Sequence, residues 1–360
     1  KPNLPEDPLG GDLTIGYDEI MSDPKLVKNL GDFFRNIIHK DLAAKGESLQ
    51  YNIFTKEQLE LPDEQLIEAF IETAKKNVLY IHDSIREEIR AVSKLWYEGA
   101  NRIVKEIGSA YDISWQRVAG VMAALSPQKD WFQNISLGER AVDIYQNHRD
   151  AKVSDDQMRY MLTATGEKNK PVFNKREYKA EMDYLQKHRP SIRDIEKGGE
   201  FNGANPSFLK AMILRSYDET YNEKGHYVVT PDGIKGEVAR NDKGEEAKIG
   251  WQSFENISKS IDILSASEDN LMQVISIRMG GAHKVRNFFN NIADPNGLMK
   301  DVTIDTHAIA IAFLKPLAGK DVEVGHGLNG SGVTGKVRGV PGSGPRGISG
   351  TYGLLAEAYR

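Results

Sequence analysis

The sequence predicts a mostly α-helical protein that carries one small β-hairpin. Apolar residues recur at three- and four-residue steps in the stretches before residue 150 and after residue 253, as on the buried face of an amphipathic helix. Ser and Asp residues stand at the starts of these stretches, where they favour helix N-caps. Strand signals are confined to Tyr227-Val228-Val229 and the alternation after Pro231-Asp232-Gly233, with Asp-Gly as the turn of a hairpin.

The chain before residue 150 contains three long predicted helices. Asp83 is expected to cap a helix whose apolar positions run from Ile85 to Val104. Ser114 is expected to cap a second helix over 115–125, and a third covers 131–147. The segment Ser126-Pro127-Gln128-Lys129-Asp130 separates these two helices, because proline disfavours helix in the residue before it. Residues 1–60 are predicted to be irregular apart from a short helix around 32–40.

Residues 150–252 differ from the flanking sequence in being rich in Lys, Glu, Asn and Gly, with few evenly spaced apolar positions. This composition predicts an insertion that contains the small β-hairpin. The insertion is either a lid or DNA-facing arm, or a solvated excursion without function.

Helical periodicity resumes at Ser253, and Ser267 is a candidate cap for the next helix. The run Arg278-Met279-Gly280-Gly281-Ala282 then predicts a tight turn, followed at once by a helix over 283–292. Two short helices joined by such a turn are typical of a helix-hairpin-helix motif. A buried helix over 302–314 follows, entered through Asp305, and a glycine-rich loop covers 325–350.

The amino-acid composition excludes several kinds of chemical site. The chain of 360 residues has no cysteine, which excludes disulfides, thiolate metal sites and cysteine nucleophiles. We expect no metal and no cofactor, an intracellular setting, and no membrane span, since no stretch approaches about 20 apolar residues. The formal net charge of −5 weighs mildly against a nucleic-acid partner, although a local basic face is sufficient for binding.

Two residues are the main candidates for chemistry. Lys284 follows the glycine turn just inside a helix, where the helix dipole and burial both disfavour its charged form and favour a nucleophilic amine. The alternative is a solvated surface lysine. Asp305 stands between apolar segments at a helix start, where it either caps the helix or takes part in a reaction. His307 is expected to be structural, since no second histidine lies at ligand spacing.

The three blocks "VAGVMAALSPQKDWFQN", "MGGAHKVRNFFNNI" and "VTIDTHAIAIAFL" together resemble the helix-hairpin-helix (HhH-GPD) DNA glycosylase superfamily. The resemblance implies a helix-hairpin-helix fold that acts on an extruded base in DNA. It places Gln128 at the base-flipping site, Lys284 at the nucleophilic lysine and Asp305 at the catalytic aspartate. The DNA contacts that it implies are Gly280, Gly281, Ala282, His283, Arg286 and Trp131, and the glycine-rich loop adds Lys336 and Arg338.

Several departures from the superfamily pattern point to a divergent branch. Ala282 replaces the second hairpin glycine, and Arg286 stands where the superfamily prefers a small residue. The chain is more similar to a phage-associated branch that includes alpha-glutamyl/putrescinyl thymine pyrophosphorylase-like proteins, which implies the host cytoplasm as location. The expected organisation is an N-terminal lead-in and helical extension (1–82), a glycosylase-like core (83–149 and 253–320), the insertion (150–252), and a glycine-rich loop with the start of a C-terminal helix (321–360).

Three functions remain open from the sequence. The first is excision of a modified base by a glycosylase/AP-lyase mechanism, with Lys284 as nucleophile and Asp305 as its partner. The second keeps the fold but transfers an amino acid or polyamine co-substrate to a (pyro)phosphorylated 5-hydroxymethyl-pyrimidine in DNA. The third is a DNA-binding module without catalytic activity.

Overall fold

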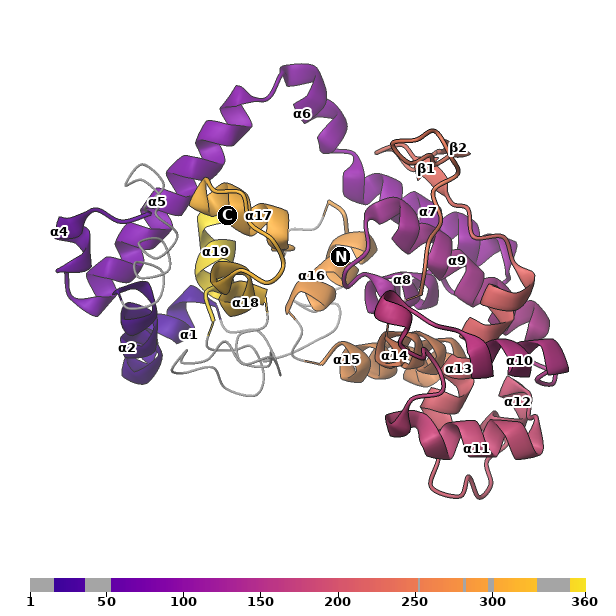
Figure 1. Ribbon diagram of the computed structural model, residues 1–360. Helices are drawn as coiled ribbons and strands as arrows, with labels where there is room; N and C mark the ends of the chain where they lie inside the picture. Colours follow the sequence, from indigo (N-terminus) through magenta and orange to yellow (C-terminus); the bar gives the residue numbers. More distant parts are fainter. Residues whose placement is uncertain (1–15, 36–52, 252, 281–282, 297–300, 329–349) are drawn as a thin grey trace. The chain divides into compact units, whose positions relative to one another are not determined.

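The computed structural model describes residues 16–35, 53–251, 253–280, 283–296, 301–328 and 350–360. The chain divides into two compact units. We call Lys1–Lys94 with Gly280–Arg360 the discontinuous unit, and Leu95–Met279 the central unit. Each is described by itself below, and Figure 1 labels their elements.

The discontinuous unit joins the two ends of the sequence in one hydrophobic core. Its long helix α5 packs against α2, α17 and α19. A cluster of buried phenylalanines (Phe33, Phe34, Phe54, Phe70 and Phe313) fills the space between these helices. The helices are α1 (Tyr17–Ser22), α2 (Pro24–Phe33), α4 (Lys56–Leu59), α5 (Asp63–Ser84), α6 (Glu87–Ser93), α16 (His283–Ala293), α17 (Thr306–Phe313), α18 (Val322–Leu328) and α19 (Tyr352–Tyr359).

The central unit is built around α8, which is buried over most of its length from Arg117 to Leu125. Small residues such as Gly120 on this helix allow α14 and α15 to approach closely, so that a Cβ atom at Gly120 would contact Ile263 and Ile275. The elements are α7 (Trp96–Ala110), α8 (Trp115–Leu125), α9 (Trp131–His148), α10 (Asp155–Thr163), η3 (Glu167–Asn169), η4 (Arg176–Tyr178), α11 (Lys179–His188), α12 (Ile192–Glu196), α13 (Pro206–Tyr221), β1 (Tyr227–Val229), β2 (Lys235–Val238), α14 (Phe254–Ser265), η5 (Glu268–Asn270) and α15 (Leu271–Met279).

The structure confirms a mostly helical fold with a small antiparallel hairpin. The helices predicted over 115–125 and 131–147 are α8 and α9, and Asp130 caps α9 by accepting a hydrogen bond from Gln133 N. Ser253 caps α14 in the same way, through Asn256 N. In the hairpin, Gly233 has a φ of 88° and donates to the carbonyl of Thr230, so Asp-Gly forms the turn as predicted.

Three predictions about the helices were wrong. The helix expected from Asp83 is three helices, because Asp83 lies in the last turn of α5 and the backbone is extended at Ile85. Ile89 and Val92, counted as its buried face, are about half exposed on α6. The helix expected over 302–314 begins only at Thr306. The stretch 1–60, expected to be irregular apart from a helix around 32–40, contains α1, α2 and α4, and residues 36–40 lie outside the described part of the chain.

The segment 150–252 is more ordered than its composition predicts. It contains α10 to α13 before the hairpin, and α13 packs against α14 and α9 with Leu209 and Leu214 fully buried. Its grouping also differs from the prediction, since this segment lies in one compact unit with α8 and α14, whereas α16 and α17 belong to the discontinuous unit. The reason is that α17 buries Phe313 against Phe70 of α5.

No helix in the described ranges combines the length and apolarity that a membrane crossing requires.

The hairpin turn rests directly on α7. An added Cβ at Gly99 would collide with the backbone of Pro231 and Gly233, and one at Gly233 would collide with the backbone of Gly99. Two glycines therefore permit this close approach. We predict that Gly99→Ala lowers the free energy of unfolding by about 1–3 kcal/mol, as overpacking does, in chemical denaturation. Hydrogen exchange at Gly233 N should speed up as well, whereas unchanged stability and exchange would contradict the close contact.

Candidate functional site around Lys284 and Asp305

A hydrogen-bonded network fixes the extended segment 302–305 against α16 and α19. Asn287 of α16 donates to the carbonyl of Val302 (3.1 Å) and to the Tyr352 hydroxyl (3.0 Å). The Tyr352 hydroxyl in turn donates to the Val302 carbonyl (2.9 Å) and accepts from Ile304 N (3.0 Å). Side chains from two helices thus take the place of a neighbouring strand, and they satisfy the backbone of a buried segment.

Asn291 extends this contact one helical turn further, by donating to the Thr303 hydroxyl at 2.9 Å. Residues 284, 287 and 291 are spaced by three and four positions, so they share one face of α16. That face is the one that holds the segment leading to Asp305. The helix therefore presents Lys284 on the side of Asp305, although the two residues are 21 positions apart.

Lys284 is a half-buried lysine whose ammonium has neither a hydrogen bond nor an ion pair with a residue that the structure describes. Burial lowers the pKa of its amine, and the negative charge of Asp305 acts in the opposite direction with a smaller effect. Two lysines that are more deeply buried are paired: Lys210 with Asp262 at 3.0 Å, and Lys315 with Glu323 at 3.2 Å. Lys284 thus lies near a carboxylate without being neutralised by it.

Asp305 caps α17: one oxygen, Oδ1, accepts a hydrogen bond from Ala308 N at 2.8 Å. The capping interpretation of this residue is therefore confirmed. It uses only one carboxylate oxygen, and Oδ2 has no hydrogen-bond partner among the described residues. Burial raises the pKa of the Tyr359 phenol, and the negative charge of the Asp305 carboxylate raises it further. The Tyr359 hydroxyl donates to the Ala308 carbonyl at 2.8 Å.

The glycine turn that leads into α16 is only partly described. Gly280 has a φ of 54°, in the left-handed region that favours glycine. Gly281, Ala282 and the side chain of His283 lie outside the described part of the chain. The boundary between the two compact units falls between Met279 and Gly280, so the two helices of the predicted helix-hairpin-helix motif belong to different units.

Arg286 differs from the DNA contact that the resemblance implies. Its side chain is fully buried, and its guanidinium donates to the carbonyl of Gly280 at 3.3 Å. A buried arginine that binds the turn backbone supports the fold of the turn and cannot reach a phosphate on the surface. Lys336 and Arg338 lie outside the described residues.

Gln128 and Trp131 lie in the central unit. Gln128 is exposed in the turn between α8 and α9 and has a φ of 59°, which is uncommon for a residue with a side chain and is found preferentially at functional sites. Trp131 is 9% exposed, with its ring 5.6 Å from that of Trp96, as expected for a core tryptophan.

Sequence reasoning missed Lys129, which follows Gln128 in that turn. It is half-buried, and burial lowers the pKa of its amine; the negative charge of Asp130 acts against this, and the positive charge of Arg215 acts with it. Like Lys284, it has no hydrogen bond or ion pair from its ammonium to a described residue. It also missed Asn287, Asn291 and Tyr352, for which the only signal is the helical spacing of the two asparagines.

Within the described ranges, no group of three or more His, Asp or Glu side chains is arranged to hold a metal ion.

Comparison with known proteins adds one similarity. Residues 63–179 match a family model described as a family of unknown function (DUF7178). The match covers less than half of the chain and includes Gln128 and Lys129, but not Lys284 or Asp305. Neither the curated proteins nor the solved structures contain a significant match.

The network around Tyr352 generates a stability prediction. Tyr352→Phe removes a hydroxyl that makes three hydrogen bonds and leaves the buried Ile304 N–H without its partner. We expect the free energy of unfolding to fall by about 1–3 kcal/mol in urea denaturation. Tyr359→Phe is the matched control on the same helix, because it removes one hydrogen bond and should cost about 0.5–1.5 kcal/mol. A smaller loss for Tyr352→Phe than for Tyr359→Phe would contradict the network.

The unpaired amine generates a second prediction. Lys284→Met replaces a half-buried ammonium with an apolar side chain of similar length, so the variant should be more stable than the wild type at pH 7. The folded-state pKa of Lys284 is lowered, so the cost of burying its charge is full below that pKa. The cost disappears as pH rises through the folded pKa towards the unfolded one. The advantage of the variant should therefore shrink at alkaline pH in parallel denaturation curves, and a destabilised variant would show that Lys284 has a stabilising partner.

Proposed function

We propose that the protein is a DNA-processing enzyme that excises a modified, extruded base, with Lys284 as nucleophile and Asp305 as its acid–base partner. One observation carries the proposal: a half-buried lysine without a paired counterion lies on the helix face that binds the segment ending in Asp305. Burial lowers the pKa of the Lys284 amine and so increases the fraction of the neutral form, which is the form that nucleophilic catalysis requires. The sequence blocks that resemble the HhH-GPD glycosylases contain both residues.

In the proposed reaction the neutral Lys284 amine attacks C1′ of the target nucleotide. The bond between C1′ and the base breaks, and the base leaves with the bonding electrons and then takes up, by way of Asp305, the proton that the amine releases. Asp305 stabilises the positive charge that develops on the sugar, then accepts the proton released by the attacking amine through the oxygen that does not cap α17. Opening of the sugar ring gives a Schiff base between Lys284 and C1′. Elimination of the 3′ phosphate and hydrolysis then release the nicked strand and the free lysine.

The sequence resemblance assigns Gln128 to the gap left by an extruded base, and Gln128 lies in the central unit. Its exposure and its left-handed backbone fit a polar side chain held out at the tip of a turn. Such a backbone conformation costs on the order of 1–3 kcal/mol for a residue with a side chain.

The test is covalent trapping. Borohydride reduces a Schiff base, so wild-type protein incubated with oligonucleotides that contain modified bases should form a borohydride-stable DNA complex, and Lys284→Ala should form none. Asp305→Asn should slow trapping by about 10²–10⁴-fold. Lys129→Ala is the matched control, because Lys129 is the other unpaired, half-buried lysine of the described chain with a lowered pKa.

The products separate the alternatives. A nicked strand or abasic site supports excision, whereas intact DNA with a changed base mass in nucleoside mass spectrometry would replace it with transfer of an amino acid or polyamine. Trapping that disappears with Lys129→Ala but persists with Lys284→Ala would show that Lys129, and not Lys284, is the nucleophile. Binding without any change in the DNA would leave only a DNA-binding module.

A further inference from the structure

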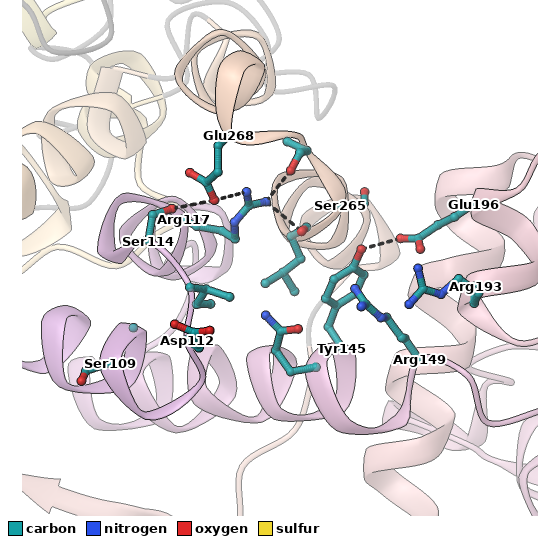
Figure 2. A pocket seen from close by; sticks show the side chains of 15 residues that line it. Ser109, Asp112, Ser114, Arg117, Tyr145, Arg149, Arg193, Glu196, Ser265 and Glu268 are labelled. Carbon is teal, nitrogen blue, oxygen red and sulfur yellow. Dashed lines mark hydrogen bonds and ion pairs between the residues drawn. The ribbon is translucent and has the colours of Figure 1, made fainter.

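The central unit contains a polar cavity of about 640 Å³, a size typical of small-molecule sites. It is bordered by the end of α7, the start of α8, the C-terminal part of α9, α12 and the end of α14. The residues that carry the argument are Asp112, Tyr145, Arg149, Arg193 and Glu196, which Figure 2 shows in close-up.

Arg117 and Glu268, which line one part of the cavity, already have partners within the protein. The Arg117 guanidinium donates to the carbonyls of Ile263, Leu264 and Ala266, at the end of α14. It also pairs with Glu268 at 2.6 Å. Arg117 is nearly fully buried, so this arginine holds α8 and α14 together and offers little to a ligand.

Arg149 and Arg193 are different, and they lie on the Tyr145–Glu196 side of the cavity (Figure 2). Their backbones are adjacent, because Arg193 N donates to the Arg149 carbonyl at 2.9 Å. The Arg149 guanidinium lies over the Tyr145 ring, 5.2 Å from its centroid, and has no ion pair with a carboxylate of the described chain. Arg193 uses only its Nε, in a contact with the exposed Asp150 at 3.2 Å.

The Tyr145 hydroxyl connects these arginines to Glu196. It donates to Glu196 Oε1 at 2.6 Å and interacts with the Arg149 guanidinium, while burial raises the pKa of the phenol. The stacking and this contact orient Arg149 but leave most of its five N–H donors unused. Two adjacent guanidinium groups with unused donors provide the bidentate geometry that phosphate oxygens require.

The lining also contains acceptors, so a bare anion does not complement it. Asp112 lies on the side away from these arginines, and Glu196 keeps one oxygen without a described partner. Carboxylates in a nucleotide site accept hydrogen bonds from sugar hydroxyls. Asp112 also has a φ of 52°, a left-handed conformation that places this carboxylate on a tight turn between α7 and α8.

We propose that this cavity binds a nucleotide, with its phosphate on Arg149 and Arg193 and its hydroxyl or amino donors on Asp112 and Glu196. The phosphate belongs either to a free mononucleotide or to one nucleotide of a strand. The proposal involves neither Lys284 nor Asp305, so it stands or falls independently of base excision.

The test is calorimetric titration of the full-length protein at constant ionic strength, with chloride as the balancing anion. The probes are inorganic phosphate, ribo- and deoxyribonucleoside 5′-monophosphates, and a single-stranded 12-nucleotide DNA. We expect Arg149→Gln and Arg193→Gln each to weaken nucleotide binding at least tenfold. Arg159→Gln is the matched control, since it removes one exposed arginine charge from the same unit and should leave affinity unchanged.

Binding of the monophosphates with this variant pattern identifies a free nucleotide, and binding of the oligonucleotide alone with the same pattern identifies a strand. A loss of affinity for ribonucleotides but not deoxyribonucleotides in Asp112→Asn would place the sugar at that carboxylate. If Arg149→Gln does not fold, as judged by circular dichroism, Arg193→Gln alone decides. Absence of binding by every probe, or equal affinity of the arginine variants and Arg159→Gln, would overturn the proposal.

Discussion

The candidate site depends on the way α16 holds the extended segment before Asp305. A segment outside helices and sheets has backbone N–H and C=O groups without partners in regular structure. When such groups are buried, leaving them unsatisfied is unfavourable, so neighbouring side chains must bind them. Asn287 and Tyr352 satisfy the carbonyl of Val302 and the amide of Ile304. Because these residues come from α16 and α19, the register of the segment is fixed from two sides. The position of Asp305 relative to Lys284 follows from that register.

A lysine that the fold leaves without a partner is an energetic cost that the protein tolerates. The buried ammonium groups of Lys210 and Lys315, by contrast, are paired with Asp262 and Glu323. The Asp305 carboxylate lies near enough to act on Lys284, yet one of its oxygens is committed to Ala308 N. A buried amine without a paired counterion has a lowered pKa, which increases the neutral, nucleophilic fraction that enzymes with reactive lysines require. Burial of the Lys284 amine therefore lowers the stability of the protein and raises the neutral fraction of the amine.

The sequence was informative wherever local signals agreed with the packing. Asp305 was expected as a cap as well as a catalytic group and does cap α17, and Asp232-Gly233 forms the hairpin turn. Ser114 and Ser267, also expected as caps, precede α8 and η5 but make no capping hydrogen bond with their side chains. It misled where apolar residues at helical spacing are exposed, as at Ile89 and Val92, because periodicity alone does not report which face is covered. The charged sequence of 150–252 concealed α13, because its buried positions are a continuous run over 209–214 with Ser216 and Asp218, and include the charged residues Lys210 and Asp218, so they show no simple apolar periodicity. The contacts of Asn287 and the cavity of Arg149 required coordinates, because the spacing of polar residues does not show which distant segment they contact.

The central claim is that the Lys284 amine is neutral over a wider pH range than an ordinary lysine, and the most direct measurement is its own titration. Protein labelled with ¹⁵N at the lysine Nζ would be followed by NMR from neutral to alkaline pH, with the Lys284→Met spectrum assigning the signal. Because Lys284 is buried, we expect its pKa to lie below the value of about 10.4 for an unperturbed lysine. We also expect a further fall in Asp305→Asn, since the carboxylate raises the pKa. A Lys284 that titrates together with the exposed lysines, and does not respond to Asp305→Asn, would contradict the central claim.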